Sequence, residues 1–174
     1  MGWVLRMFQS RERSLMLILL KSLVIPLPEY CFQLWNPWKA IDIQAIEAIQ
    51  RTFTYKITEV LHLNYWKRLH KLKLCSLQWR RERYIIIYIW KITQYMVPNI
   101  DGTMGAINIL QPWLYNSLPK YLRDIEIVKT EKLKFELDKF LELIPDPPKM
   151  PNYVTASGSN SILDQLSHLW AQGI

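Results

Sequence analysis

The sequence predicts an all-α protein, a small irregular helical bundle, and three observations lead to that prediction. Only five of the 174 residues are glycine, which argues against a turn-rich β fold. Apolar residues recur at spacings of three and four over 40–58 and 130–143, the pattern of helices with one buried face. The apolar run 84–90 could be a buried strand, but the pattern around it extends over about 18 residues without glycine or proline, which favours a helix.

Length and composition predict one folded domain with a tail. The chain has 174 residues and a mass of 20.9 kDa, and half of its residues are hydrophobic, which excludes disorder for most of it. We expect a helical region over 1–95. A loop and a C-terminal helix of the same domain follow over 96–144. The segment 145–174 is predicted to be a Pro/Ser-rich, partly disordered tail with a short terminal helix.

The first predicted helix runs over 10–25. Ser10 is a suitable N-cap, and one face carries Leu15, Ile18, Leu19 and Ser22. Pro26 and Pro28 should end or kink this helix, because proline lacks the amide hydrogen and clashes with the preceding turn. A turn is expected at 35–38 around Asn36-Pro37.

Two further helices are predicted in the first half of the chain. The helix over 40–58 has Asp42 in its first turn and buries Ile46, Ile49, Phe53 and Ile57. The helix over 65–74 is capped by Asn64. Its apolar face carries Tyr65, Leu69 and Leu72, and its basic face carries Lys67, Arg68 and Lys71.

The fourth predicted helix runs over 76–94. We expect Arg80, Arg83, Ile87 and Lys91 on its outer face, and Tyr84, Tyr88 and Ile92 on its inner face. A loop follows over 97–112, and Pro119 breaks the next stretch.

The C-terminal part contains one strong helix and one short one. The helix over 130–143 should bury Leu133, Leu137, Phe140, Leu141 and Ile144. Asp138 and Glu142, with Lys134 nearby, are interpreted as a solvated face of this helix. The prolines at 145, 147, 148 and 151 start an extended linker. Ser161 should cap a final short helix with Leu163, Leu166 and Trp170.

The residue types needed for catalysis are not arranged as a site. The aspartates are never adjacent, so a two-metal carboxylate site is not indicated, and His62, His70 and His168 are isolated. Cys31 and Cys75 form no CxxC pair, and we expect both to be buried thiols. We therefore predict no catalytic residue, no metal ligand, no cofactor and no small-molecule substrate.

No apolar segment approaches the roughly 20 residues that cross a bilayer, because the longest candidate, 15–27, is interrupted by Lys21, Ser22 and Pro26. We expect an intracellular protein, cytoplasmic or nuclear, with reduced thiols and no membrane partner.

Positive charge is concentrated in the middle of the chain. The net charge is +7, but residues 51–100 carry ten basic side chains against two acidic ones, a net of +8. Trp66, Trp79 and Trp90 lie among these cations. Lys and Arg contact phosphates and aromatic rings stack on bases, so this region predicts nucleic-acid binding. A solvated basic face with tryptophans in the core is the alternative.

Several short motifs follow one another along the chain. Residues 42–53 read DIQAIEAIQRTF, 63–69 read LNYWKRL, and further pieces lie at 19–26, 29–31, 35–37, 77–91, 116–119, 135–141 and 160–165. Their order resembles the region just after the palm of a non-LTR (LINE-type) retrotransposon reverse transcriptase, where the first two motifs correspond to the family patterns DI..IE.VQR.F and LSY.ERL. Trp66 and Lys67 stand where the family commonly has acidic residues, so the capping box at Asn64 is lost.

The resemblance implies a helical thumb that grips the backbones of template and primer. It also implies that the polymerase carboxylates lie in a palm, because the family's F.DD signature has no counterpart in this sequence. We expect a non-catalytic fragment of an RNA-directed DNA polymerase whose partner is an RNA or DNA backbone. The expected phosphate contacts are Arg51, Lys67, Arg68, Lys71, Arg80 and Arg83, with Trp66 as a stacking residue.

Two alternatives use the same features differently. The chain could be an inactive structural remnant or a protein-interaction module, since a thumb normally buries one face against its neighbours. The basic helix over 65–74 could instead lie on a membrane surface, although it is short and its apolar face lacks bulk.

Overall fold

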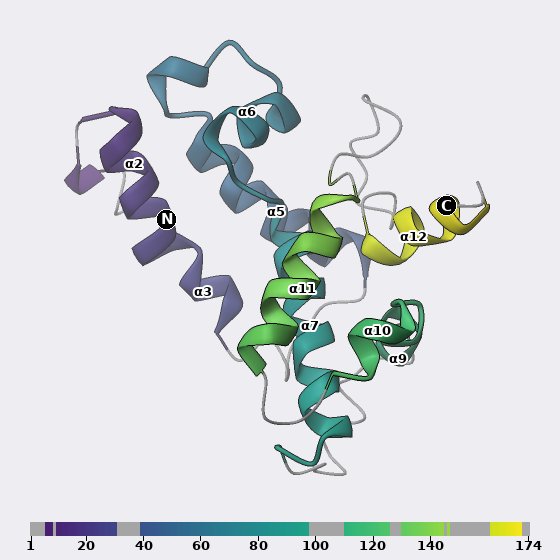
Figure 1. Cartoon of the computed structure of the whole chain (residues 1–174). Helices are drawn as coiled ribbons and strands as arrows, with labels where there is room; N and C mark the ends of the chain where they lie inside the picture. The colour runs from purple at the N-terminus through teal and green to yellow at the C-terminus, as the bar shows by residue number, and fades with distance from the viewer. Residues whose placement is uncertain are drawn as a thin grey trace.

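The computed structural model describes residues 6–8, 10–30, 39–97, 110–125, 130–144, 146 and 161–171. Within these ranges every regular element is helical and no strand is present, so the predicted all-α class is confirmed (Figure 1). The turn predicted at 35–38 and the prolines of the predicted linker lie outside the described residues.

The first helix differs from its prediction at both ends. Helix α2, Arg13–Leu19, begins after Glu12, and the Ser10 hydroxyl only accepts a 3.4 Å hydrogen bond from the Glu12 amide. The chain does not stop at Pro26. A π-helical turn, η1, Leu20–Val24, leads into the short helix α3, Pro26–Glu29, where the proline takes the first helical position that tolerates it.

The buried face of this segment is also not the predicted one. Met16, Leu19, Leu20 and Val24 face the core, whereas Ile18 is 63 % exposed and Ser22 is exposed. The Ser22 hydroxyl donates to the Ile18 carbonyl at 2.7 Å on the outer side. Turning this hydroxyl outward lets a wholly apolar stripe enter the core.

Helix α5, Ala40–Thr54, ends four residues before its predicted end. The Thr54 hydroxyl donates to the Gln50 carbonyl at 2.9 Å, which competes with the helix ladder. The chain then continues through the 3₁₀ turn η2, Thr58–Val60, to helix α6, Tyr65–Leu72. Of the predicted α5 stripe, Phe53 and Ile57 are fully buried, and Ile46 and Ile49 pack partly against the same cluster.

Helix α7, Leu77–Thr93, confirms the helical interpretation of the apolar run. The Ser76 hydroxyl caps it by accepting from the Trp79 amide at 3.2 Å. The predicted division into an outer and an inner face is wrong, since Ile87 is buried and Tyr84 and Tyr88 are only half-buried. Apolar clusters contact α7 on several sides, so a single polar face does not exist.

The C-terminal helices pack around α7. They are α9, Leu110–Asn116; α10, Lys120–Arg123; α11, Thr130–Glu142; and α12, Ile162–Ala171. The loop predicted over 97–112 is wrong at its end, because residues 110–112 start α9. Pro119 precedes α10 and separates it from α9, as predicted.

Two apolar clusters hold the described helices together. The first joins α2, η1 and α5 with Leu72 and Leu77, and the second joins α7 with α9 to α12. The predicted stripe of α11 is confirmed, with Leu133, Leu137 and Leu141 buried. Helix α12 is confirmed too, and its Ile162 and Leu166 are buried in the second cluster. Because α7 contributes to both clusters, it connects the two halves of the fold (Figure 1).

Two acidic side chains meet the amino end of α7. Glu47 of α5 is 4 % exposed and accepts bonds from the Tyr65 hydroxyl and from the amides of Leu77 (3.3 Å) and Gln78 (3.2 Å). Asp146 accepts from the Ser76 amide and hydroxyl, both at 2.6 Å. The free amides and the positive end of the α7 dipole attract these carboxylates. Through Glu47 the junction attaches α5 and α6 to α7, and through Asp146 it attaches the segment after α11 to α7.

Burial makes Asp146 a source of pH dependence. Loss of solvent raises the pKa of Asp146 from 3.8 to about 6, despite its bonds to Ser76. The carboxyl group of Asp146 therefore binds its proton more tightly in the folded state than in the unfolded state. As a result, the contribution of Asp146 to the free energy of unfolding falls as pH rises from about 4 to 6. We expect the free energy of unfolding of Asp146→Asn, taken relative to that of the wild type, to be roughly 1–2 kcal/mol higher at pH 7.5 than at pH 4. Urea unfolding at both pH values measures this difference, and a constant difference would contradict it.

Candidate nucleic-acid interface

Helix α6 is held by caps at both ends. The Asn64 side chain accepts from the Lys67 amide at 2.9 Å, which confirms the predicted cap. At the other end Lys73 adopts the left-handed conformation, with φ 54°, and closes the helix. The apolar side is as predicted, with Tyr65, Leu69 and Leu72 buried. The position of this helix relative to the core is thereby fixed.

The opposite side of α6 is basic and exposed. We name it the α6 basic surface, which consists of Lys67, His70, Lys71 and Lys73. Among the described residues, no carboxylate forms an ion pair with any of its three lysines. Arg13 lies beside it, donating to the Lys71 carbonyl at 3.1 Å, with Glu59 at 3.9 Å. Unpaired cations on one short helix can contact an anionic backbone without breaking internal pairs.

His70 and Lys73 were not among the predicted contacts. His70 lies three residues after Lys67, and this spacing is the signal that could have indicated it, since residues three and four apart share a helix face. Lys73 follows the last residue of α6, so helical spacing could not have indicated it. Arg13 could not be found in this way, because it reaches α6 from a helix that lies 58 residues earlier.

Trp66 lies at the edge of the same helix. Its side chain is half-buried, and its ring centroid is 5.2 Å from that of Tyr65, at an interplanar angle of 57°. Part of the indole remains exposed, and Trp66 directly precedes the exposed Lys67 in the sequence. A base could stack only on that exposed part.

Arg68 does not belong to the basic surface, contrary to the sequence prediction. It is 5 % exposed and donates to the carbonyls of Leu63 (2.9 Å) and Arg51 (3.3 Å). Its guanidinium carbon lies 5.5 Å from the Tyr55 ring centroid and 5.8 Å from that of Tyr65. Burial lowers the pKa of Arg68 below its usual range. Arg68 therefore fastens the carboxyl end of α5 to α6.

Arg51 is half-buried on α5, and its guanidinium carbon lies 5.0 Å from the Tyr65 ring centroid. A cation near an aromatic face is attracted by the ring quadrupole. This contact keeps Arg51 on the buried side of α6, next to Arg68, and not on the α6 basic surface.

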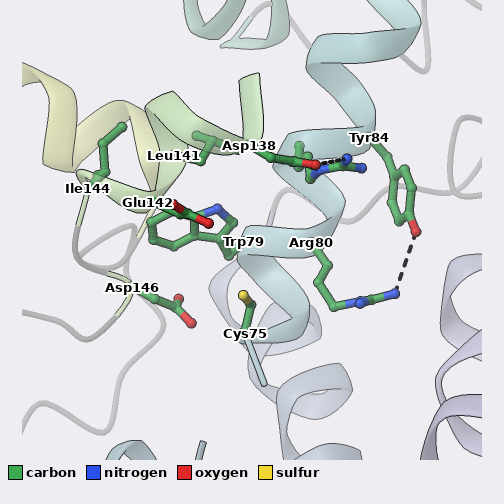
Figure 2. Close-up of a pocket in the computed structure, with 10 residues that line it drawn as sticks. Cys75, Trp79, Arg80, Tyr84, Asp138, Leu141, Glu142, Ile144 and Asp146 are labelled. Carbon is green, nitrogen blue, oxygen red and sulfur yellow. Dashed lines mark hydrogen bonds and ion pairs between the residues drawn. The ribbon is translucent and has the colours of Figure 1, made fainter. Parts of the chain in front are cut away.

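Arg80 and Arg83 lie on α7 and are paired with acids. Arg80 binds Glu29 through two nitrogens, at 2.6 and 3.2 Å, and Arg83 binds Asp138, at 2.5 and 2.7 Å (the dashed line at Asp138 in Figure 2 marks the second pair). Burial acts to lower the pKa of Arg80, but Glu29 outweighs it and the pKa is raised. The hydrogen bond from Asp138 raises the pKa of Arg83. The sequence predicted a solvated face of α11 at Asp138. In the structure this face is instead joined to α7 through Arg83.

The predicted site residues thus fall into two groups. Trp66, Lys67 and Lys71 lie on the outer part of α6, whereas Arg51 and the buried Arg68 lie on its inner side, next to Tyr65. Arg80 and Arg83 lie on α7 between α3 and α11, and their charges are already neutralised. Only the first group includes unpaired, exposed cations.

Other candidate chemistry is limited in the part of the chain that the structure describes. No three His, Cys, Asp or Glu side chains of these residues converge on a position that could hold a metal ion. Cys75 is exposed, which corrects the expected buried thiol, while Cys31 lies outside the described residues. Within the described ranges, the helices are too short or too polar to cross a membrane.

No protein-family model, no curated protein and no solved structure matches this chain.

Proposed function

We propose that this chain binds the sugar-phosphate backbone of RNA or DNA through the α6 basic surface, as a non-catalytic, thumb-like part of a LINE-type reverse transcriptase. The resemblance of its motifs to that region of the family supports the proposed origin. The net charge of +8 over residues 51–100 supports a polyanionic partner.

The observation that carries this proposal is the combination of exposure and missing acids on α6. Lys67 and Lys71 are exposed, and no described carboxylate pairs with either of them. Asn64 and the buried apolar side hold their helix in place, so the two cations are presented in a fixed arrangement. The exposed part of Trp66 belongs to the same helix.

Salt dependence tests this proposal. Contacts from Lys67, Lys71 and Lys73 each displace about one counterion, so a plot of the logarithm of the affinity against the logarithm of the salt concentration should have a slope of about −3. Fluorescence anisotropy with a labelled RNA–DNA duplex at 50 to 300 mM salt measures the slope. An affinity that does not change with salt would rule out backbone binding.

A second function, protein interaction, is favoured by exposed apolar side chains near the amino end. Ile18, Leu27 and Ile41 are each more than 60 % exposed, on α2, α3 and α5. Surfaces of this kind mark interaction sites or drive aggregation. A monomer in sedimentation that melts cooperatively, without binding a hydrophobic dye, would argue against this function.

A further inference from the structure

A cavity of about 480 Å³ lies between the start of α7 and the end of α11 (Figure 2). Trp79, Leu141 and Ile144 form its apolar wall, and Cys75, Arg80 and Arg83 line it from the α7 side. Its volume is in the range of small-molecule sites, which combine a mainly apolar wall with a few polar groups. This cavity is separate from the α6 basic surface and plays no part in the proposed function.

Some of the charged side chains that line the cavity have an ion-pair partner and others do not. Each arginine is held by two bonds to a carboxylate, Arg80 to Glu29 and Arg83 to Asp138. Glu142 and Asp146 also line the cavity, and neither forms an ion pair with a described residue. Among the described residues, the lining charges that have no ion-pair partner are therefore negative. An anionic ligand would have to break an arginine pair, whereas a cation would not.

We propose that this cavity binds a small linear aliphatic amine in its protonated form. The hydrocarbon chain would lie on Trp79, Leu141 and Ile144, and the ammonium group would be received by the carboxylates of Glu142 and Asp146. In Figure 2, Asp146 lies on the side of Trp79 away from Arg80, and the Glu142 carboxylate is drawn over the indole ring. A compact ammonium on an apolar stem matches a site with an apolar wall and acidic groups beside it.

The surroundings of Asp146 support a cation there. Its bonds to Ser76 leave the negative charge poorly stabilised, because burial raises the pKa of Asp146 to about 6 and the charge of Glu47 acts in the same direction. Although Cys75 is exposed as a residue, partial loss of solvent around its sulfur raises the pKa of the thiol, which therefore stays neutral at pH 7 and adds no charge. An ammonium beside Asp146 would compensate its charge.

Titration of the whole chain with n-pentylammonium, followed by NMR of the tryptophan indole groups, tests this proposal. We expect saturable binding that shifts the Trp79 signal, and about fivefold weaker binding to Glu142→Gln and to Asp146→Asn, as for partly solvated ion pairs. Glu131→Gln on the same helix removes the same charge away from the cavity and should bind like the wild type. The uncharged 1-pentanol should bind at least fivefold more weakly than the amine.

Three results would overturn the proposal. They are equal binding of pentanol and pentylammonium, unchanged amine affinity in Glu142→Gln, and no shift of the Trp79 signal at millimolar amine. Because Glu142 is exposed, its substitution should leave the fold intact, so a loss of binding in that variant reports on the site. None of these outcomes depends on whether the chain binds nucleic acid.

Discussion

Replacing Glu47 with alanine should lower the free energy of unfolding by about 3 kcal/mol, a large part of the 5–15 kcal/mol typical of a domain. The variant removes the acceptor of three hydrogen bonds, from the Tyr65 hydroxyl and from the Leu77 and Gln78 amides. Burial and the charge of Glu47 raise the pKa of Tyr65, so its hydroxyl stays protonated as a donor and is left unsatisfied in the variant. Urea unfolding followed by circular dichroism measures the loss.

Glu47→Gln is the matched control. Burial raises the pKa of Glu47, so the environment tolerates a neutral side chain, and a glutamine oxygen can still accept from an α7 amide. We expect the glutamine variant to lose less than half of what the alanine variant loses. If both variants unfold within about 0.5 kcal/mol of the wild type, Glu47 does not hold α5 and α6 against α7.

The largest functional effect is expected for the double variant Lys67→Glu and Lys71→Glu. It removes two phosphate contacts and adds two repulsive charges at the same place, so affinity for an RNA–DNA duplex should fall roughly 30- to 100-fold at low salt. Both side chains are exposed, and their substitution leaves the buried side of α6 untouched. Anisotropy titration at 50 mM salt measures the loss.

The control for this variant changes the net charge equally on another helix. Lys132 and Lys139 of α11 are exposed, so Lys132→Glu with Lys139→Glu also lowers the net charge by four. This variant should lose affinity only a few-fold, through the long-range field. Similar losses in the two double variants would show that net charge alone drives binding and that α6 is not the site.

Local features of the fold were predictable where periodicity and capping agreed. The stripe of Leu133, Leu137 and Leu141 and the Asn64 cap depend on neighbours three and four residues away, and both are present in the structure. The first helix was predicted less well: the π-helical turn changes the spacing from Leu20 onward and so displaces Ser22, whereas Ile18 precedes this turn and is exposed because the core contacts the side of α2 with Met16 and Leu19. The α7 faces could not be predicted because helices distant in sequence cover them on several sides.

The candidate site was predictable only in part, for a related reason. Lys67 and Lys71 are exposed, as the amphipathic pattern of α6 predicts. Arg68 follows Lys67 directly, but its long side chain turns toward the aromatic rings and the free carbonyls at the end of α5. The acids that pair with Arg80 and Arg83 lie 51 and 55 residues away, and no local pattern indicates such pairs.

The central claim is that the exposed lysines of α6 contact the nucleic-acid backbone. Lysine acetylation of the whole chain with and without a saturating RNA–DNA duplex, read by mass spectrometry, tests it most directly. We expect Lys67, Lys71 and Lys73 to be protected several-fold by the duplex, while Lys132 and Lys139 of α11 react at unchanged rates. Protection of the α11 lysines with full reactivity at Lys67 and Lys71 would contradict the claim.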